Sequence, residues 1–262
     1  MIDVPLLQTR NLAVTIAGIN VCHSLDFTVA RGQRWAILGR NGSGKTTLLH
    51  TLAGLLPPAA GSIEFDGRPV AALTLREVAR FRALLPQHDS DAFPATVLET
   101  ALIGRHPHLS RWQWESADDW RIAREALAAA DMADTEWRDV RTLSGGERRR
   151  VALAALLAQQ PQLFLLDEPS SHLDLQHQIA LLDRLSALAR DARKALLMVL
   201  HDINLAARYC DRLAILDAGH LVAIGPPNEA LTPQVLRQAF ELEGQIIDTP
   251  AGPMVAARRA PG

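Results

Sequence analysis

The sequence has little cysteine, no long apolar run and almost no net charge, and each absence narrows the functions open to the chain. Two cysteines among 262 residues, Cys22 and Cys210, cannot build a disulfide framework, so a reducing compartment is expected. The longest apolar run, residues 151–158, falls well short of the roughly 18 residues of a membrane span. Residues 1–5 lack the basic and apolar pattern that begins a signal peptide. A net charge of −2 gives the chain no overall positive potential that would attract nucleic acid. We therefore expect a soluble protein without a nucleic-acid partner, which reaches a membrane only through other chains.

Strand patterns and helical patterns alternate along the chain, and this alternation predicts an α/β fold with a mainly parallel core sheet. Apolar runs bounded by turn residues predict strands at 12–16, 25–29, 35–38, 163–166 and 195–200, and hairpins at 62–67 and 212–224. Apolar residues at helical spacing predict helices at 45–55, 121–132, 175–190 and 203–209.

The stretch from residue 88 to 160 differs in character from the rest and predicts a helical lobe inserted into the core. It holds four of the five tryptophans, Trp112, Trp114, Trp120 and Trp137, for which we expect packing in the lobe's core or at an interface. Residues 1–87 and 161–250 then form the core of a single domain that spans residues 1–262. The tail, 251–262, is weakly patterned and is expected to fray.

Residues 39–46 match the phosphate-binding pattern G-x-x-x-x-G-K-[ST] between a predicted strand and a predicted helix. Glycines let the backbone curl until its N–H groups point at the β- and γ-phosphates, and the following helix adds the positive end of its dipole. Lys45 would supply a positive charge to these oxygens, and the Thr46 hydroxyl would ligate Mg²⁺. The candidate nucleotide-binding residues are Gly39, Arg40, Asn41, Gly42, Ser43, Gly44, Lys45, Thr46 and Thr47.

Two carboxylates, Asp167 and Glu168, end the apolar strand predicted at 163–166. Asp167 at the tip of a neighbouring strand could hold Mg²⁺ through water, beside the phosphate loop. Glu168 would then be placed to polarise an attacking water, a role worth about 10²–10⁴ in rate. Alone, such a pair is most often a solvated turn; together with the loop upstream it indicates a nucleoside triphosphatase.

The segment Leu143-Ser144-Gly145-Gly146-Glu147 resembles the signature motif of the ABC ATPases. The other markers of that family follow in the right order. Gln87 resembles the Q-loop glutamine, residues 171–174 resemble the D-loop, and His201 resembles the switch histidine. The arginines that follow the signature, 148–150, are interpreted as a solvated helix face. The resemblance covers nearly the whole chain.

Membership of this family implies a phosphate-loop cassette with an N-terminal antiparallel β-subdomain and an inserted helical subdomain. It implies ATP and Mg²⁺ as cofactors and a head-to-tail homodimer that buries two ATP molecules between its copies. The implied roles are Glu168, His201, Gln87 and Lys45 in catalysis, Thr46, Gln87 and Asp167 toward Mg²⁺, and Ser144, Gly145, Gly146 and Asp174 on the ATP held by the second copy.

One position departs from the family's pattern. Members usually carry an aromatic residue in the first hairpin that stacks on adenine, and the best-aligned residue here is Ile16, with Ala17 beside it. Plain apolar contact would replace stacking, so we expect weak selectivity for ATP over GTP.

The stretch Gly-Arg-His-Pro-His at 104–108 resembles cassettes of the large-permease importers for cobalamin, ferric siderophores and haem. The resemblance implies a peripheral protein on the cytoplasmic face of a bacterial inner membrane. Its partners would be integral permease subunits and, indirectly, a periplasmic substrate-binding protein. Cobalamin or a ferric siderophore is favoured as cargo, with haem behind them. An exporter subunit, a non-transport ABC ATPase and a module without catalysis remain the alternatives, although Glu168 and His201 speak against the last.

Overall fold

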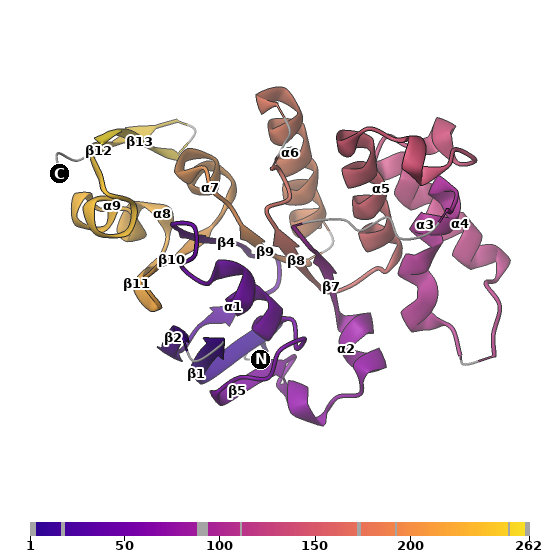
Figure 1. The fold of residues 1–262 in the computed structure, drawn as a ribbon, viewed down its shortest axis with the longest axis horizontal. Coiled ribbons are helices and arrows are strands. Elements are labelled where there is room, and N and C mark those ends of the chain that lie inside the picture. The colour runs from indigo at the N-terminus through magenta and orange to yellow at the C-terminus, as the bar shows by residue number, and fades with distance from the viewer. Residues whose placement is uncertain are drawn as a thin grey trace.

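A six-stranded sheet runs through the middle of the molecule (Figure 1), and the predicted mainly parallel α/β core is confirmed. The computed structural model describes residues 4–16, 19–87, 94–110, 112–171, 174–191, 193–250 and 252–259, except the side chains of Ile16, Ile19, Asn20 and Asp191. The strands lie in the order β11-β10-β4-β9-β8-β7, and all but β11 are parallel. They are β4 (Arg34–Gly39), β7 (Arg82–Leu85), β8 (Leu163–Asp167), β9 (Ala195–Val199), β10 (Arg212–Asp217) and β11 (His220–Gly225).

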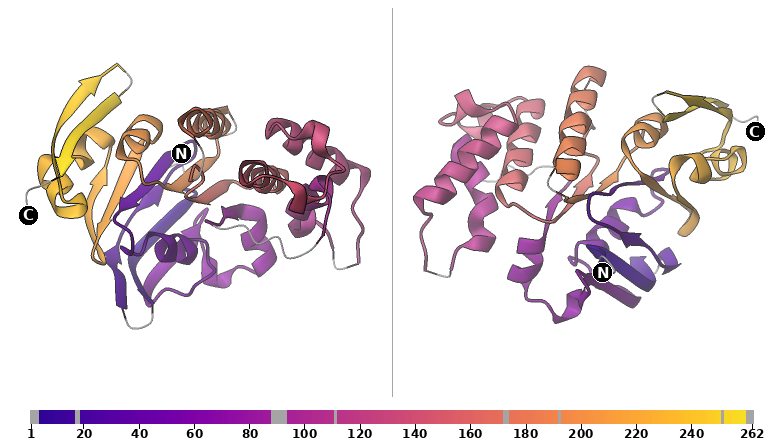
Figure 2. Two further views of the ribbon diagram at one scale, coloured as in Figure 1. Left: turned by 45° about the horizontal axis from the view of Figure 1, so that its top comes forward. Right: turned by 180° about the vertical axis from the view of Figure 1, so that it is seen from behind.

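The central strands β4, β9 and β8 are apolar except at Arg34, which begins β4, and Asp167, which ends β8, as expected for a sheet covered on both faces. Leu163 and Leu165 of β8 pack on the face that carries α1, whereas Phe164 and Leu166 pack on the opposite face. Figures 1 and 2 show α1 and an antiparallel sheet on one side, with α6, α7 and α9 on the other. The helices of this core are α1 (Lys45–Leu52), α2 (Leu75–Phe81), α6 (Leu175–Asp191), α7 (Ile203–Tyr209), α8 (Pro227–Ala230) and α9 (Pro233–Phe240), with a 3₁₀ turn η1 (Val70–Ala72).

The antiparallel sheet contains the strands β1 (Leu7–Ile16), β2 (Ile19–Leu25), β3 (Thr28–Val29), β5 (Ala60–Phe65) and β6 (Arg68–Pro69). The prediction of one strand at 25–29 is wrong, because β2 ends at Leu25 and β3 begins at Thr28. The buried Thr9 side chain stabilises the break. Its hydroxyl donates to the Leu25 carbonyl at 2.8 Å and accepts from the Phe27 N–H at 3.0 Å.

A separate hydrophobic core holds the helical lobe together. The lobe contains α3 (Val97–Leu102), η2 (Ile103–His108), α4 (Ala117–Ala129), η3 (Ala133–Thr135), η4 (Val140–Thr142) and α5 (Gly145–Ala158). Each of its three α-helices begins with a capping box, in which the cap hydroxyl and an acidic side chain satisfy two backbone N–H groups. One of these, Ser116 with Asp119, explains why α4 begins earlier than the predicted 121–132; the helix also ends earlier, at Ala129.

The stretch 104–108 lies within η2 and packs closely against α5. A Cβ on Gly104 would lie 2.0 Å from the Ala155 carbonyl oxygen, so only glycine allows this approach. The buried Arg105 guanidinium donates to the Asp119 carboxylate and to the Ala158 carbonyl, both at 2.8 Å. The Pro107 carbonyl accepts from arginines of α2 and so ties the lobe to the core.

Of the two placements expected for the lobe tryptophans, packing in the lobe core applies to one, and the interface placement stays a prediction for the other three. Trp112, Trp114 and Trp137 are 87%, 87% and 74% exposed, and only Trp120 packs against the lobe core. The three exposed residues lie between the capped helices, where the helical spacing that would turn a side chain inward is absent.

Residues 252–259 of the tail, which was expected to fray, instead form β13 (Gly252–Arg259), paired with β12 (Leu242–Thr249); residues 251 and 260–262 lie outside the described residues. Val255 enters the main core, and the Asn204 side chain of α7 bonds both its N–H, at 2.7 Å, and its carbonyl, at 3.3 Å. The strand of the tail, whose sequence pattern is short and weak, is thus stabilised by Asn204, a residue distant in sequence. No helix in the described part of the chain is long and apolar enough to cross a bilayer.

Replacing Asp119 by alanine should destabilise the protein by about 3 kcal/mol, because it leaves the Arg105 charge buried and unpaired. The Ser116 hydroxyl and then the Arg105 guanidinium lower the Asp119 pKa to about 2. The wild-type advantage should therefore be complete above about pH 4 and shrink as pH falls toward 2. Urea unfolding followed by circular dichroism measures it. Asp118→Ala, at the exposed neighbouring carboxylate, is the matched control; an equal effect of both variants would refute the interpretation.

Candidate functional site

The predicted catalytic and metal-binding residues come together at the carboxyl ends of four adjacent parallel strands. The phosphate loop follows β4, His201 follows β9, Asp167 ends β8, and Gln87 follows β7. Parallel strands in register bring their carboxyl ends to one edge of the sheet, where ligands of open α/β sheets bind. Four segments that are far apart in sequence therefore share one edge.

The phosphate loop depends on glycine at its two ends. Gly44 is the N-cap of α1 with a φ of 91°, and a Cβ there would lie 2.1 Å from Cγ1 of Val21. At Gly39 a Cβ would lie 2.3 Å from the Leu216 carbonyl oxygen. The loop therefore turns directly from the strand into the helix and leaves a concavity at the helix N-terminus that suits an anion.

Lys45 is buried at the start of α1, with its ammonium group folded back on the loop. It donates to the Gly39 carbonyl at 2.9 Å and to the Arg40 carbonyl at 2.8 Å. Burial lowers the Lys45 pKa, and the negative charges of Glu168 and Asp167 partly oppose that shift. A phosphate above the loop would offer this charge stronger acceptors than the carbonyls that it now contacts.

Asp167 is fully buried, and neither of its carboxylate oxygens has a hydrogen-bond partner. Burial raises the Asp167 pKa. The nearby Thr46 hydroxyl and the Lys45 charge oppose this rise, although the Thr46 hydroxyl does not form a regular hydrogen bond with either Asp167 oxygen. The buried hydroxyl oxygen of Ser43 is also unpaired. Unpaired carboxylate and hydroxyl oxygens are the donors that a hard divalent cation prefers, so these residues fit Mg²⁺.

Glu168 and His201 contact one another, with 2.5 Å between Oε1 and Nε2. The Glu168 side chain is 12% exposed and the His201 side chain 45%, so the pair lies at the rim of the site. The Glu168 backbone is in the left-handed region with a φ of 48°, which is unusual for a residue other than glycine. Its carbonyl accepts from the Ser171 N–H at 3.2 Å and from the Ser171 hydroxyl at 2.9 Å.

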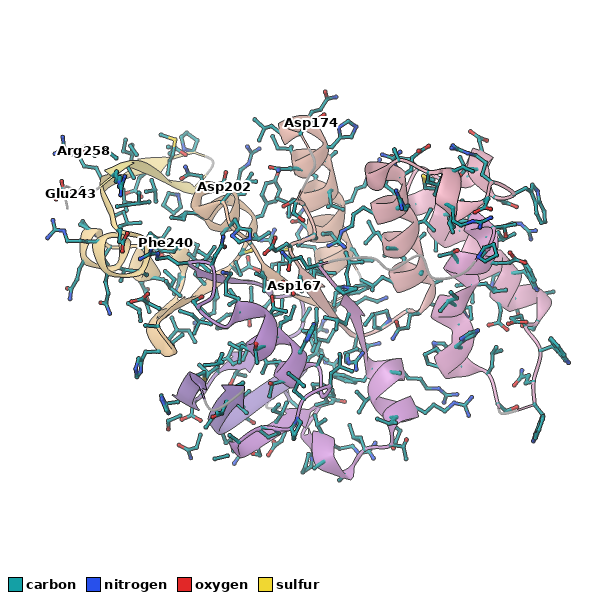
Figure 3. The ribbon with its side chains drawn as sticks, in the orientation of Figure 1. Asp167, Asp174, Asp202, Phe240, Glu243 and Arg258 are labelled. Atoms are coloured by element: carbon teal, nitrogen blue, oxygen red, sulfur yellow. The ribbon has the colours of Figure 1, made fainter. Side chains whose placement is uncertain are left out.

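Gln87 is half-buried and lies next to Pro86, just beyond β7. Residues 88–93, which complete its loop, lie outside the described residues. So do residues 172 and 173 of the predicted D-loop, Ala17, and the side chain of Ile16. Asp174 lies at the exposed start of α6 (Figure 3), where its carboxylate accepts from His177 Nδ1 at 2.8 Å.

The signature residues do not join this cluster. Ser144 caps α5 on the surface of the helical lobe, its hydroxyl accepting from the Glu147 N–H at 3.3 Å. Bonds from Ser144 and then Arg138 lower the Glu147 pKa to about 2. Across the described ranges no hydrogen bond or ion pair joins Ser144, Gly145 or Gly146 to the phosphate loop, and a Cβ on Gly145 would meet open space. The family resemblance implies that these residues act on the ATP of a second copy, which stays a prediction; Ser144 and Gly145 are exposed and Gly146 is half-buried.

Arg149 was missed by the sequence reasoning. The interpretation of 148–150 as a solvated face is wrong for Arg149, which is 8% exposed. Its guanidinium donates to the carbonyls of Pro86 at 2.6 Å, Asp167 at 2.9 Å and Glu168 at 3.1 Å. The available signal was its helical spacing from Leu153 and Leu156, both of which face the core.

A second missed contact ties the phosphate loop to the C-terminal part of the chain. Arg40, within the loop, forms an ion pair with Glu241, which directly follows α9. The phosphate loop therefore has an ion pair to a distant part of the chain, in addition to the conformation that its own glycines allow.

Comparison with known proteins agrees with the family resemblance of the sequence motifs. A family profile described as ABC transporter matches residues 22–171. The hemin import ATP-binding protein HmuV of Nocardia farcinica is 44% identical over 249 residues, covering 93% of this chain and 85% of its own. The petrobactin import ATP-binding protein FpuD of Bacillus anthracis is 37% identical over 246 residues, covering 93% and 89%. Among solved structures, a metal-chelate type ABC transporter in an inward-facing conformation superposes with a TM-score of 0.84 at 27% identity, covering 97% of both chains.

Asp167→Asn should stabilise the nucleotide-free protein by about 1 kcal/mol at neutral pH, because it removes an unpaired buried charge. Because burial raises the folded-state pKa of Asp167, the cost of its charge builds up as pH rises from the ordinary aspartate pKa to the raised one and is complete above it, so the gain should vanish below the ordinary aspartate pKa. The variant should also lose ATP hydrolysis. Urea unfolding without nucleotide or Mg²⁺ measures the gain, and Asp174→Asn, at an exposed carboxylate, is the control. A loss of stability at neutral pH would contradict the burial argument.

Proposed function

The chain belongs to the ABC transporter family of ATP-hydrolysing cassettes, and on that premise we propose that it powers the import of haem through a separate membrane permease. Cassettes of this family bind and hydrolyse ATP, work with permease subunits and dimerise. The observation that carries the proposal is likeness over nearly the full chain to a hemin import ATP-binding protein.

The phosphate loop and Lys45 bind the β- and γ-phosphates in this proposal. Thr46, Gln87 and Asp167 hold Mg²⁺, Asp167 through water, and the orphaned Asp167 oxygens support that assignment. Mg²⁺ held by these residues would supply positive charge that offsets the negative charge of the phosphates. When ATP binds, the Lys45 ammonium group exchanges the Gly39 and Arg40 carbonyls for phosphate oxygens, and the phosphate takes the place in the loop that the ammonium group leaves.

Glu168 orients and polarises the attacking water, and His201 holds the Glu168 carboxylate at the rim of the site. The 2.5 Å contact between the two side chains supports this pairing. Phosphoryl transfer is governed mainly by positioning and charge stabilisation, so a fixed carboxylate is the chief contribution that a side chain makes here.

The site is completed by a second copy of the chain in a head-to-tail homodimer. Ser144, Gly145, Gly146 and Asp174 of one copy meet the ATP held by the other. Support comes from the exposure of Ser144 and from the absence, in the described residues, of any bond between the signature and its own phosphate loop.

The permease contacts the groove between the core and the helical lobe. This groove is lined by Leu84, Pro86, Ile103, Gly104 and Leu143, and it adjoins Gln87, so occupation of the groove is felt at the nucleotide site. Ile103, 54% exposed at the groove, offers an apolar contact. The complex then lies on the cytoplasmic face of the inner membrane, with a periplasmic binding protein as an indirect partner.

Haem moves ahead of cobalamin and ferric siderophores as the cargo. The sequence alone placed haem behind them, but the relative at 44% identity is named for hemin import and that at 37% for petrobactin. A ferric siderophore is therefore the second candidate. The residues assigned above serve the nucleotide and none of them selects the cargo.

Glu168→Gln should bind ATP with unchanged affinity, because the loop and Lys45 remain, yet hydrolyse it about 10²-fold or more slowly. ATP and Mg²⁺ should trap the closed dimer of this variant, seen as doubled mass in size-exclusion chromatography with light scattering. Glu125→Gln, at an exposed carboxylate of α4, should behave as wild type. Near-normal turnover by Glu168→Gln would remove Glu168 from its proposed role.

The cargo is tested with the chain reconstituted with its permease in lipid vesicles. Binding protein loaded with haem should stimulate ATP hydrolysis more than the same protein loaded with a ferric siderophore or cobalamin. Stimulation by the siderophore alone would move the assignment to the second candidate. Indifference to every loaded binding protein would reject import of these cargoes while leaving the ATPase itself intact.

A further inference from the structure

We propose that Arg149 is a positioning residue that holds Glu168 of its own chain in its working conformation, and that helix α5 thereby links the two nucleotide sites of the dimer. The inference rests on the proposed role of Glu168 and deepens it. The catalytic, metal-binding and nucleotide-binding residues assigned above do not include Arg149.

Arg149 reaches from the helical lobe into the catalytic edge of the core sheet. It belongs to α5, but its guanidinium is buried against carbonyls that follow two core strands. It bonds Pro86, the residue before Gln87, and it bonds Asp167 and Glu168 at the end of β8. The planar fork of a guanidinium suits this task because its N–H donors point in fixed directions.

The Glu168 backbone needs external support. A φ of 48° is unfavourable for a glutamate and persists only where surrounding contacts impose it. The Glu168 carbonyl accepts bonds from Arg149 Nη2 and from Ser171, which fix the peptide that follows it. The side chain leaves the same Cα toward His201, so the carbonyl contacts also decide where the carboxylate lies.

Helix α5 serves two sites at once. Its N-cap, Ser144, is the signature residue for the ATP held by the other copy, while Arg149 further along the same helix holds Glu168 of its own copy. A helix moves as a rigid unit, with a rise of about 1.5 Å per residue. A shift of α5 that brings Ser144 onto the other copy's phosphate is therefore transmitted to Glu168 and to the Pro86 carbonyl.

The first test measures kcat and the Kd for ATP separately in the full-length protein. Arg149→Gln should lower kcat by about 10- to 100-fold, since misplacing a reacting group by about 1 Å costs up to about 10²-fold. Its Kd for ATP should stay within about twofold of wild type, because the hydrogen bonds that Arg149 makes to described residues go to Pro86, Asp167, Glu168 and Pro169 and not to the phosphate loop. Arg149→Lys, which keeps the charge with fewer fixed donors, should lose less. If Arg149→Gln does not fold, Arg149→Lys carries the same test.

Arg150→Gln is the matched control, because Arg150 lies on the same helix but contacts Met132 within the lobe. It should retain wild-type kcat. A merely structural role for Arg149 would lower the thermal midpoint and weaken ATP binding in step with kcat, and that result would overturn the proposal. Wild-type kcat in Arg149→Gln would overturn it as well.

The second test uses mixed dimers in which one copy carries Glu168→Gln, so that only the site of the other copy hydrolyses ATP. Arg149→Gln placed in the copy with the intact Glu168 should slow single-turnover hydrolysis as in the first test. The same substitution in the Glu168→Gln copy should leave the rate near that of the mixed dimer without it. Equal loss in both arrangements, or loss only in the second, would overturn the assignment. Absence of ATP hydrolysis in the wild type would instead reject the proposed function.

Discussion

Parallel pairing of β4, β9, β8 and β7 is the constraint on which the rest of the structure depends. It brings the phosphate loop, His201, the two carboxylates and Gln87 to one edge, although these segments are spread over most of the chain. A slip of one residue in any of these pairings would turn that strand's side chains to the other face. Burial on both faces prevents such a slip, because Leu165 and Phe164 must enter different cores.

The site is assembled in an electrostatically unsatisfied state. Asp167 holds a buried carboxylate without partners, Lys45 is buried on backbone carbonyls, and Glu168 keeps an unfavourable backbone conformation. Each of these features costs folding free energy that the cores around the sheet must offset. On the proposed function, Asp167 and Lys45 gain partners when a divalent cation and a phosphate bind, so the cost that these two side chains impose on folding is recovered in ligand affinity.

On the proposed function, the division into a core and a helical lobe makes one chain alone an incomplete catalyst. The core holds the phosphate loop and Glu168, whereas the signature caps a helix of the lobe and faces outward. Arg149 and the contacts of α2 with the Pro107 carbonyl are the links that keep the lobe in register with the core. The glycine and arginine of the stretch 104–108 are needed for the packing of the lobe, because Gly104 allows the close approach to Ala155 and Arg105 bonds the Ala158 carbonyl.

The sequence by itself determined the phosphate loop, the strand that ends in Asp167, the helix at 203–209 and the order of the family's motifs, because glycine turns, apolar runs and helical spacing are written locally. It also predicted the α/β core, because the alternation of strands and helices does not depend on the residue at which each element begins or ends. Only the tertiary structure decided that Arg149 is buried, that three tryptophans are exposed and that the tail pairs as β13. Burial and strand pairing depend on partners distant in the chain, such as Asn204 for Val255 and the β8 carbonyls for Arg149, and no local pattern specifies those partners.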